Sequence, residues 1–238
     1  MQYFIDPIGL VSFYSFLIAL VAGLYLLYTY YETKKKQRLV WGLGMVFYAI
    51  GHLIISIIFL FAITAINFEV AKFWIWIYIN LSGGVAMGCM LVGVLPIFFK
   101  EKNMYSFGIS IAYTIGYFLG TTLYGFILPG DTPLNFINLK YLLLTATYTN
   151  PSLFQYDNMS WFAVEWLIPA SFIIGLLFFQ HYKKKEANPS LFIAIHFIGY
   201  ALLLFIWPFG ELKLVFYETR AFLSFILLYG FSLLSRKQ

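Results

Sequence analysis

Three charged residues stand inside long apolar stretches of the sequence, where ionised side chains are rare. Glu165 follows the start of one such stretch near residue 161, and Glu218 and Arg220 lie in the last one. If these stretches cross a lipid bilayer, inserting each charge costs about 2.5–3.5 kcal/mol or more. The three residues are therefore the first candidates for chemistry: an ion pair that fixes helix register, or a polar cup that binds a solute or passes protons.

The spacing of the three residues sets which of them can pair. Side chains two positions apart on a helix point about 200° from each other, so Glu218 and Arg220 do not meet side to side. Glu165 falls at a similar depth in its own stretch and is a predicted partner of Arg220, with Glu218 as the alternative. Both the ion pair and the solute cup require this cluster to face the interior of a helix bundle.

Two histidines, His52 and His196, could in principle act as the axial ligands of a b-type haem. Counting about 1.5 Å per residue from the ends of their helices places them at depths of roughly 19 and 11 Å, which is a poor match. A single interhelical hydrogen bond is the commoner role for such a histidine. The only cysteine, Cys89, excludes a multi-cysteine metal site within the chain, and no hydrolase or nucleotide-binding motif occurs. We therefore predict a non-catalytic protein without cofactor or metal.

The elements that position these residues are predicted to be seven helices. Five stretches lack Asp, Glu, Lys and Arg and are long enough to cross about 30 Å of hydrocarbon, and two more are interrupted by the charges named above, with Lys213 at the outer end of the last one. Open sheets would leave backbone groups unpaired in lipid, so the fold class is an all-α membrane bundle in a single domain. The predicted helices cover 7–31, 39–66, 73–99, 105–129, 161–182, 189–209 and 212–235.

The basic residues predict the orientation of this bundle. Eleven of the fifteen fall in alternate connections or at the C-terminus, in the clusters 34–38, 100–102, 183–185 and 236–237. The positive-inside rule places these clusters in the cytoplasm, so the N-terminus is expected outside and the C-terminus inside the cell membrane. The net charge of +5 is then a result of topology and of attraction to anionic lipid.

The longest segment outside the bilayer is the predicted outer loop, 131–160. Its sequence Asn158-Met159-Ser160 matches a glycosylation sequon on the predicted outer face. Pairs of glycines four residues apart, Gly84 with Gly88 and Gly116 with Gly120, indicate close helix packing within the chain or against another subunit.

A bundle without a soluble domain or energy source is expected to be the membrane part of a larger system. The first hypothesis is a non-catalytic subunit of a transport or translocation apparatus. In helix number and in its abundance of Ile, Phe, Tyr and Lys, the chain resembles the polytopic membrane subunit of the crenarchaeal DNA-import (Ced) system. This resemblance implies partner membrane proteins and a separate ATPase, while no sequence-specific nucleic-acid site is evident. The alternatives are a small-ligand receptor that uses the outer cup, and a haem- or quinone-binding subunit of a respiratory complex.

Overall fold

The protein folds into seven long helical segments in a computed structural model, which describes residues 7–61, 68–98, 103–127, 154–185, 187–205 and 213–236. The first segment is α1 (Pro7–Thr33) and the second is α2 (Lys36–Leu60). The third is continuous through α4 (Phe68–Ile79), the π-helical turn η1 (Asn80–Val85) and α5 (Ala86–Phe98). The fourth joins α6 (Asn103–Thr122) to a second π-helical turn, η2 (Leu123–Ile127). The last three are α8 (Phe154–Lys185), α9 (Asn188–Leu204) and α10 (Lys213–Arg236).

The all-helical prediction is confirmed for the described residues, which contain no strand. Helix bounds differ from the predicted ones by a few residues, most clearly at α8, which begins at Phe154 inside the predicted outer loop. The reason is that hydropathy marks only the apolar part of a helix, whereas polar residues can continue the same helix beyond it. The earlier part of that loop lies outside the described residues.

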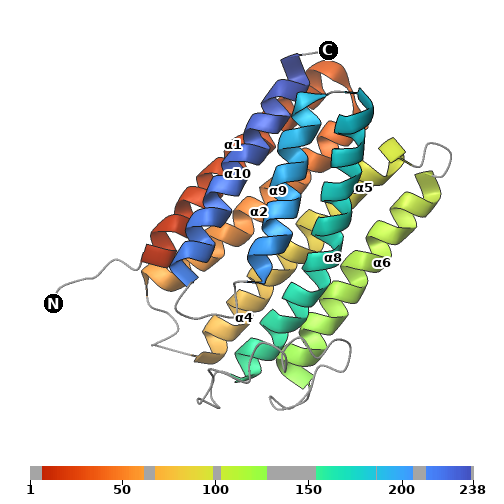
Figure 1. Ribbon diagram of the computed structural model, residues 1–238. Coiled ribbons are helices and arrows are strands. Elements are labelled where there is room, and N and C mark those ends of the chain that lie inside the picture. Colours follow the sequence, from red (N-terminus) through yellow and green to blue (C-terminus); the bar gives the residue numbers. More distant parts are fainter. Residues whose placement is uncertain are drawn as a thin grey trace.

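Contacts between successive segments close the seven segments into a ring, and Figure 1 shows the bundle from the side. Each segment packs against the next one in chain order, from α1 through α2, α4–α5, α6, α8 and α9 to α10, and α10 returns to pack against α1. The buried residues fill the inside of this ring. Side chains that point inward from α10 can therefore meet side chains from α2 and α4 without those helices being neighbours.

Glycines allow several of these helices to approach closely. An added Cβ at Gly84 would stand 3.0 Å from a ring atom of Tyr117, and one at Gly116 would stand 3.0 Å from Trp166. A Cβ at Gly88 or Gly120 would collide with Thr114 or Phe162. The predicted glycine pairs therefore pack within the chain, and their small size makes room for aromatic and hydroxyl side chains of neighbouring helices.

The outside of the bundle is strongly apolar. Large apolar side chains are exposed along several helices, for example Val21, Leu119 and Phe222, with 56%, 60% and 66% of their surface accessible. Such extensive exposed apolar surface indicates a partner or a membrane rather than water. Four described helices are long and apolar enough to cross a membrane, at Pro7–Thr33, Lys36–Leu60, Val70–Pro96 and Phe162–Lys185, and α9 is a shorter apolar helix.

Candidate functional site

The centre of the site is Arg220, whose side chain is only 4% exposed. Its Nε–H donates a hydrogen bond to the hydroxyl of Tyr48 at 2.9 Å, and its Nη1 donates to the hydroxyl of Tyr78 at 2.6 Å. These bonds join α10 to α2 and α4 across the inside of the ring. We call Arg220 with Tyr48, Tyr78 and Tyr200 the Arg220 centre.

Three aromatic rings surround the guanidinium. Its central carbon lies 5.2 Å from the ring centre of Tyr48, 5.9 Å from that of Tyr78 and 5.3 Å from that of Tyr200. Cation–π attraction at such distances amounts to about 2 kcal/mol when the cation is desolvated. The rings and hydroxyls therefore stabilise the buried cation, but they bring no negative charge to it.

The hydrogen bonds leave part of the guanidinium without a protein acceptor. An arginine side chain has five N–H donors. Among the described residues, this guanidinium donates two hydrogen bonds, both to tyrosine hydroxyls. The guanidinium therefore retains donor capacity for a bound anion or for water.

The predicted carboxylate partners lie elsewhere. Glu218 is exposed, because it is two positions from Arg220 on the same helix and points to the other side. Glu165 is half-buried on α8. Neither is among the hydrogen-bond partners that the described structure gives Arg220, which are the two tyrosines. The structure thus buries Arg220 inside the bundle and gives it tyrosine hydroxyls, not the predicted carboxylates, as hydrogen-bond partners among the described residues.

His52 joins the aromatic shell of the Arg220 centre. Its ring centre lies 4.4 Å from that of Tyr48 and 5.7 Å from that of Tyr78, in edge-on geometry. The side chain is completely buried, and neither ring nitrogen has a hydrogen-bond partner among the described residues. This is an expensive arrangement for an imidazole, because a buried polar group without a partner costs about 1–3 kcal/mol.

His196 is held differently. Its Nδ1 lies 2.7 Å from the backbone oxygen of Leu223, and its ring is stacked on Tyr200 at 6.2 Å between centres. A carbonyl oxygen can only accept, so Nδ1 must carry the proton in this bond. In the neutral ring the other nitrogen, Nε2, is then a hydrogen-bond acceptor, and protonation turns it into a donor.

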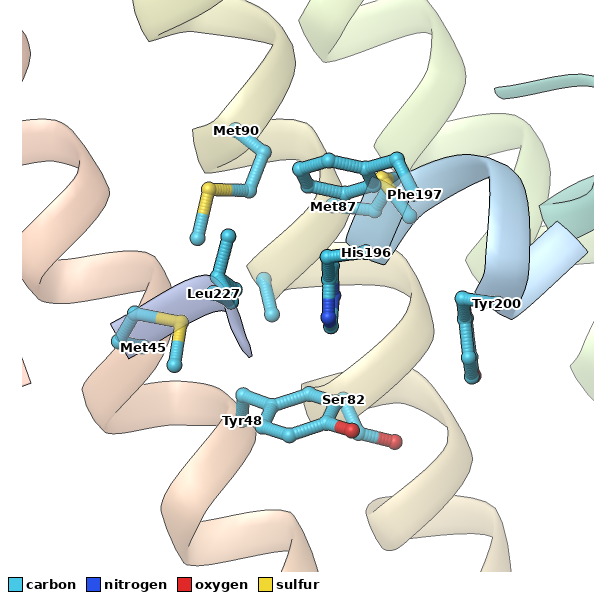
Figure 2. Close-up of a pocket in the computed structure, with 10 residues that line it drawn as sticks. Met45, Tyr48, Ser82, Met87, Met90, His196, Phe197, Tyr200 and Leu227 are labelled. Carbon is cyan, nitrogen blue, oxygen red and sulfur yellow. The ribbon is translucent and has the colours of Figure 1, made fainter. Parts of the chain in front are cut away.

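A cavity of about 40 Å³ lies beside His196. Figure 2 shows the imidazole standing among the lining side chains, with ring nitrogen on the side where Tyr48 and Ser82 lie. The cavity touches α2, η1, α5, α9 and α10, and its lining is completed by apolar residues such as Met45, Met87, Met90, Phe197 and Leu227. A volume of this size holds a small ion or very few water molecules.

The surroundings of the two histidines leave little room for a haem between them. A porphyrin between them would have to displace the tyrosines that hold Arg220 and enlarge the small cavity beside His196. No group of three or more His, Cys, Asp or Glu side chains that could hold a metal ion occurs among the described residues.

Other polar residues inside the bundle form local bonds. The hydroxyl of Thr121 donates to Oδ1 of Asn80 at 3.1 Å, and the Asn80 amide donates to the backbone oxygen of Trp76. Ser82 lies in the π-helical turn η1, and its hydroxyl donates to the backbone oxygen of Tyr78 in α4 at 2.7 Å. These bonds connect helices or satisfy single groups, and they give no separate site.

Comparisons with known proteins do not assign the chain to a family: no family model matches the sequence, and neither a curated protein nor a solved structure matches the chain.

Proposed function

We propose that the protein is an integral membrane protein that crosses the cell membrane seven times and serves as a non-catalytic subunit of a transport or translocation apparatus. Four helices that are long and apolar enough to span a bilayer, and an outside covered with apolar side chains, support the membrane location. The remaining helices belong to the same closed ring, which supports seven crossings.

The basic clusters support the orientation. The turn between α1 and α2, which carries Lys34 and Lys35, lies at the same end of the bundle as the ends of α8 and α10 (Figure 1). The end of α8 carries Lys183, Lys184 and Lys185. One basic end of a bundle is the expected cytoplasmic end, so we infer that the N-terminus is outside and the C-terminus inside.

The single observation that carries the transport proposal is the burial of Arg220 with neutral hydrogen-bond partners. A buried charge costs several kcal/mol of desolvation, and an apolar side chain of similar volume avoids that cost. Ionisable residues inside membrane bundles mark pathways and binding sites for this reason. We therefore place solute or ion passage at the Arg220 centre, in contact with the cavity beside His196. DNA import, partner membrane proteins and a separate ATPase remain predictions of the resemblance.

A small-ligand receptor is the second candidate, and it is favoured because Arg220 connects three helices through its hydrogen bonds. One side chain bonds to α2 and α4 from α10, so a ligand that competes for its donors would shift three helices relative to one another. Such a shift needs a ligand that binds one arrangement better than the other.

Reconstitution into lipid vesicles distinguishes the two candidates. Vesicles containing the wild-type protein and an entrapped pH dye should respond to an imposed gradient of a small salt faster than empty vesicles do. Arg220→Met should lose the response while remaining folded. The control change His181→Asn, near the C-terminal end of α8, should keep it. Wild-type vesicles that are no more permeable than empty ones would overturn the transport proposal and leave the receptor.

A further inference from the structure

The cavity beside His196 has an acceptor on one side and a donor on the other. Tyr48 accepts the hydrogen bond from Arg220, so its own O–H proton remains available to donate. Tyr48 and Tyr200 line the cavity and both lie within cation–π distance of the guanidinium. The chain of hydrogen bonds from Arg220 through Tyr48 therefore makes this hydroxyl a polarised donor.

The buried charge of the centre is positive. Among the described residues, the groups that touch Arg220 are neutral tyrosines, so the cation has no neutralising charge in contact with it. In a low-dielectric interior, a negative ion close to the guanidinium relieves that cost. A cavity of about 40 Å³ suits a small anion such as a halide.

His196 decides when such an ion can enter. The neutral ring presents the lone pair of Nε2 because Nδ1 is committed to the Leu223 oxygen. A lone pair repels an anion, and an N–H attracts it. Protonating His196 adds a second positive charge to the interior that already holds Arg220, and this is unfavourable without a negative charge to offset it. The anion and the proton therefore each favour binding of the other.

Other ionisable groups around His196 do not replace it in this role. Arg220 lies on α10 and bonds to Tyr48 of α2, which packs against His52, and Tyr200 lies on the same helix as His196 and stacks on it. On α8, His181 bonds to Ser190 near the other end of α9. Gly175 of α8 packs against Ile198 of α9. Glu165 is ten positions before Gly175, so it lies about 15 Å from that contact, toward the start of α8.

We propose that the cavity between Tyr48, His196 and Tyr200 binds a small monovalent anion of halide size together with one proton on His196. The inference rests on the proposed role of the Arg220 centre and names its ligand class. Affinity for the anion should fall about tenfold for each pH unit over the range in which His196 is neutral in the empty protein.

Thermal unfolding of the purified protein in detergent tests the proposal, with sodium bromide, nitrate and gluconate compared at equal ionic strength. We expect bromide and nitrate to raise the unfolding midpoint above that in gluconate, more at about pH 5 than at about pH 8. His196→Asn preserves a side-chain amide for the Leu223 oxygen but removes Nε2, and should abolish the pH dependence. Tyr48→Phe should weaken the anion effect, and His181→Asn should change neither.

The outcomes are separable from those of the vesicle experiment. Equal midpoints in all three salts at both pH values would overturn the anion site, and a cavity that holds only water would give that result. Full pH dependence retained in His196→Asn would overturn it as well. Arg220-dependent flux without an anion effect would leave transport standing and make the ligand class wrong. An anion effect without flux would leave the anion site standing and overturn the transport proposal.

Discussion

Arginine cannot lose its charge inside a protein, so burial of Arg220 has to be stabilised by its surroundings. Two hydroxyls and three aromatic rings do this in part. An ion pair would do it differently, because removing one partner of a buried pair leaves the other charge exposed to an apolar interior and costs about 3–5 kcal/mol. Tyrosines left behind by a missing arginine remain neutral.

Arg220→Met tests this difference. Methionine fills a similar volume without charge, so the loss of two hydrogen bonds is offset by the loss of the desolvation penalty. We expect an unfolding midpoint in gluconate within about 4 °C of the wild type or above it. Arg220→Ala should be less stable than Arg220→Met because it also leaves a cavity. A drop of about 3 kcal/mol or more in Arg220→Met would indicate a carboxylate partner, and a double-mutant cycle with Glu165→Gln would identify it.

His52 gives a second test at a single position. Its imidazole is fully buried and has no hydrogen-bond partner among the described residues. His52→Leu removes two polar nitrogens from that environment, so we expect the thermal midpoint to stay the same or to rise. The matched change His196→Leu should lower it, because it removes the bond to the Leu223 oxygen. Clear destabilisation by His52→Leu would show that water or another group bonds to the ring.

Sequence reasoning found Arg220 but not the tyrosines around it. A charge in an apolar stretch is visible at once, whereas tyrosine is common in this chain and counts as apolar in a hydropathy profile. A weaker signal was available in the spacing: Tyr48 is four residues before His52, and His196 is four residues before Tyr200. Residues four apart share one helix face, so each pair marked a polar patch on an otherwise apolar helix. Which patches meet depends on how the helices pack, and the packing cannot be predicted from one sequence alone.

At the scale of helices, packing of α1 against α2 depends on two glycines. A Cβ on Gly42 would lie 2.8 Å from Cγ of Leu27 and 3.1 Å from its backbone nitrogen. A Cβ on Gly23 would lie 2.9 Å from Cγ2 of Val46 and 3.1 Å from its backbone nitrogen. Because backbone atoms stand on the far side, the two helices would have to move apart to accommodate a methyl group.

Gly42→Ala and Gly108→Ala make a matched pair for this contact. Both glycines lie inside helices, where alanine is intrinsically favoured by about 1 kcal/mol. Nothing lies within 4 Å of a Cβ built on Gly108, so Gly108→Ala should be neutral or stabilising. Gly42→Ala should lower the free energy of unfolding by about 1–3 kcal/mol, measured by thermal or denaturant unfolding in detergent. Equal effects of the two changes would mean that the α1–α2 contact is loose.

Helix number and approximate bounds could be predicted because long apolar stretches have only one solution in a bilayer. The π-helical turn Asn80–Val85 could not. Tyr117 stands against Gly83 and Gly84 inside this turn. Such turns arise where packing demands one more residue than an α-helix provides, and they often occur at functional sites. Here the turn includes Ser82, which lines the cavity beside His196.

In the whole molecule, basic residues from different connections gather at one end of the seven-segment bundle. The α1–α2 turn is formed at Lys34, whose φ of 55° closes the helix, and its amide donates to the Tyr30 oxygen. The turn is so short that its basic cluster has to stay at one end of the bundle. Lys183, Lys184 and Lys185 complete the last turn of α8 at that same end (Figure 1).

Cysteine labelling of intact cells tests the orientation of that end. With Cys89 replaced by alanine, the chain has no native cysteine, and single cysteines can be placed at Lys35, Lys140 and Lys184. The anionic inner leaflet and the positive-inside rule predict that a membrane-impermeant maleimide reaches position 140 in intact cells. Positions 35 and 184 should react only after permeabilisation. Position 140 lies outside the described residues, and α8 is the described helix between it and position 184. The reverse pattern would invert the topology, and labelling of 140 and 184 from the same side would show that α8 does not cross the membrane.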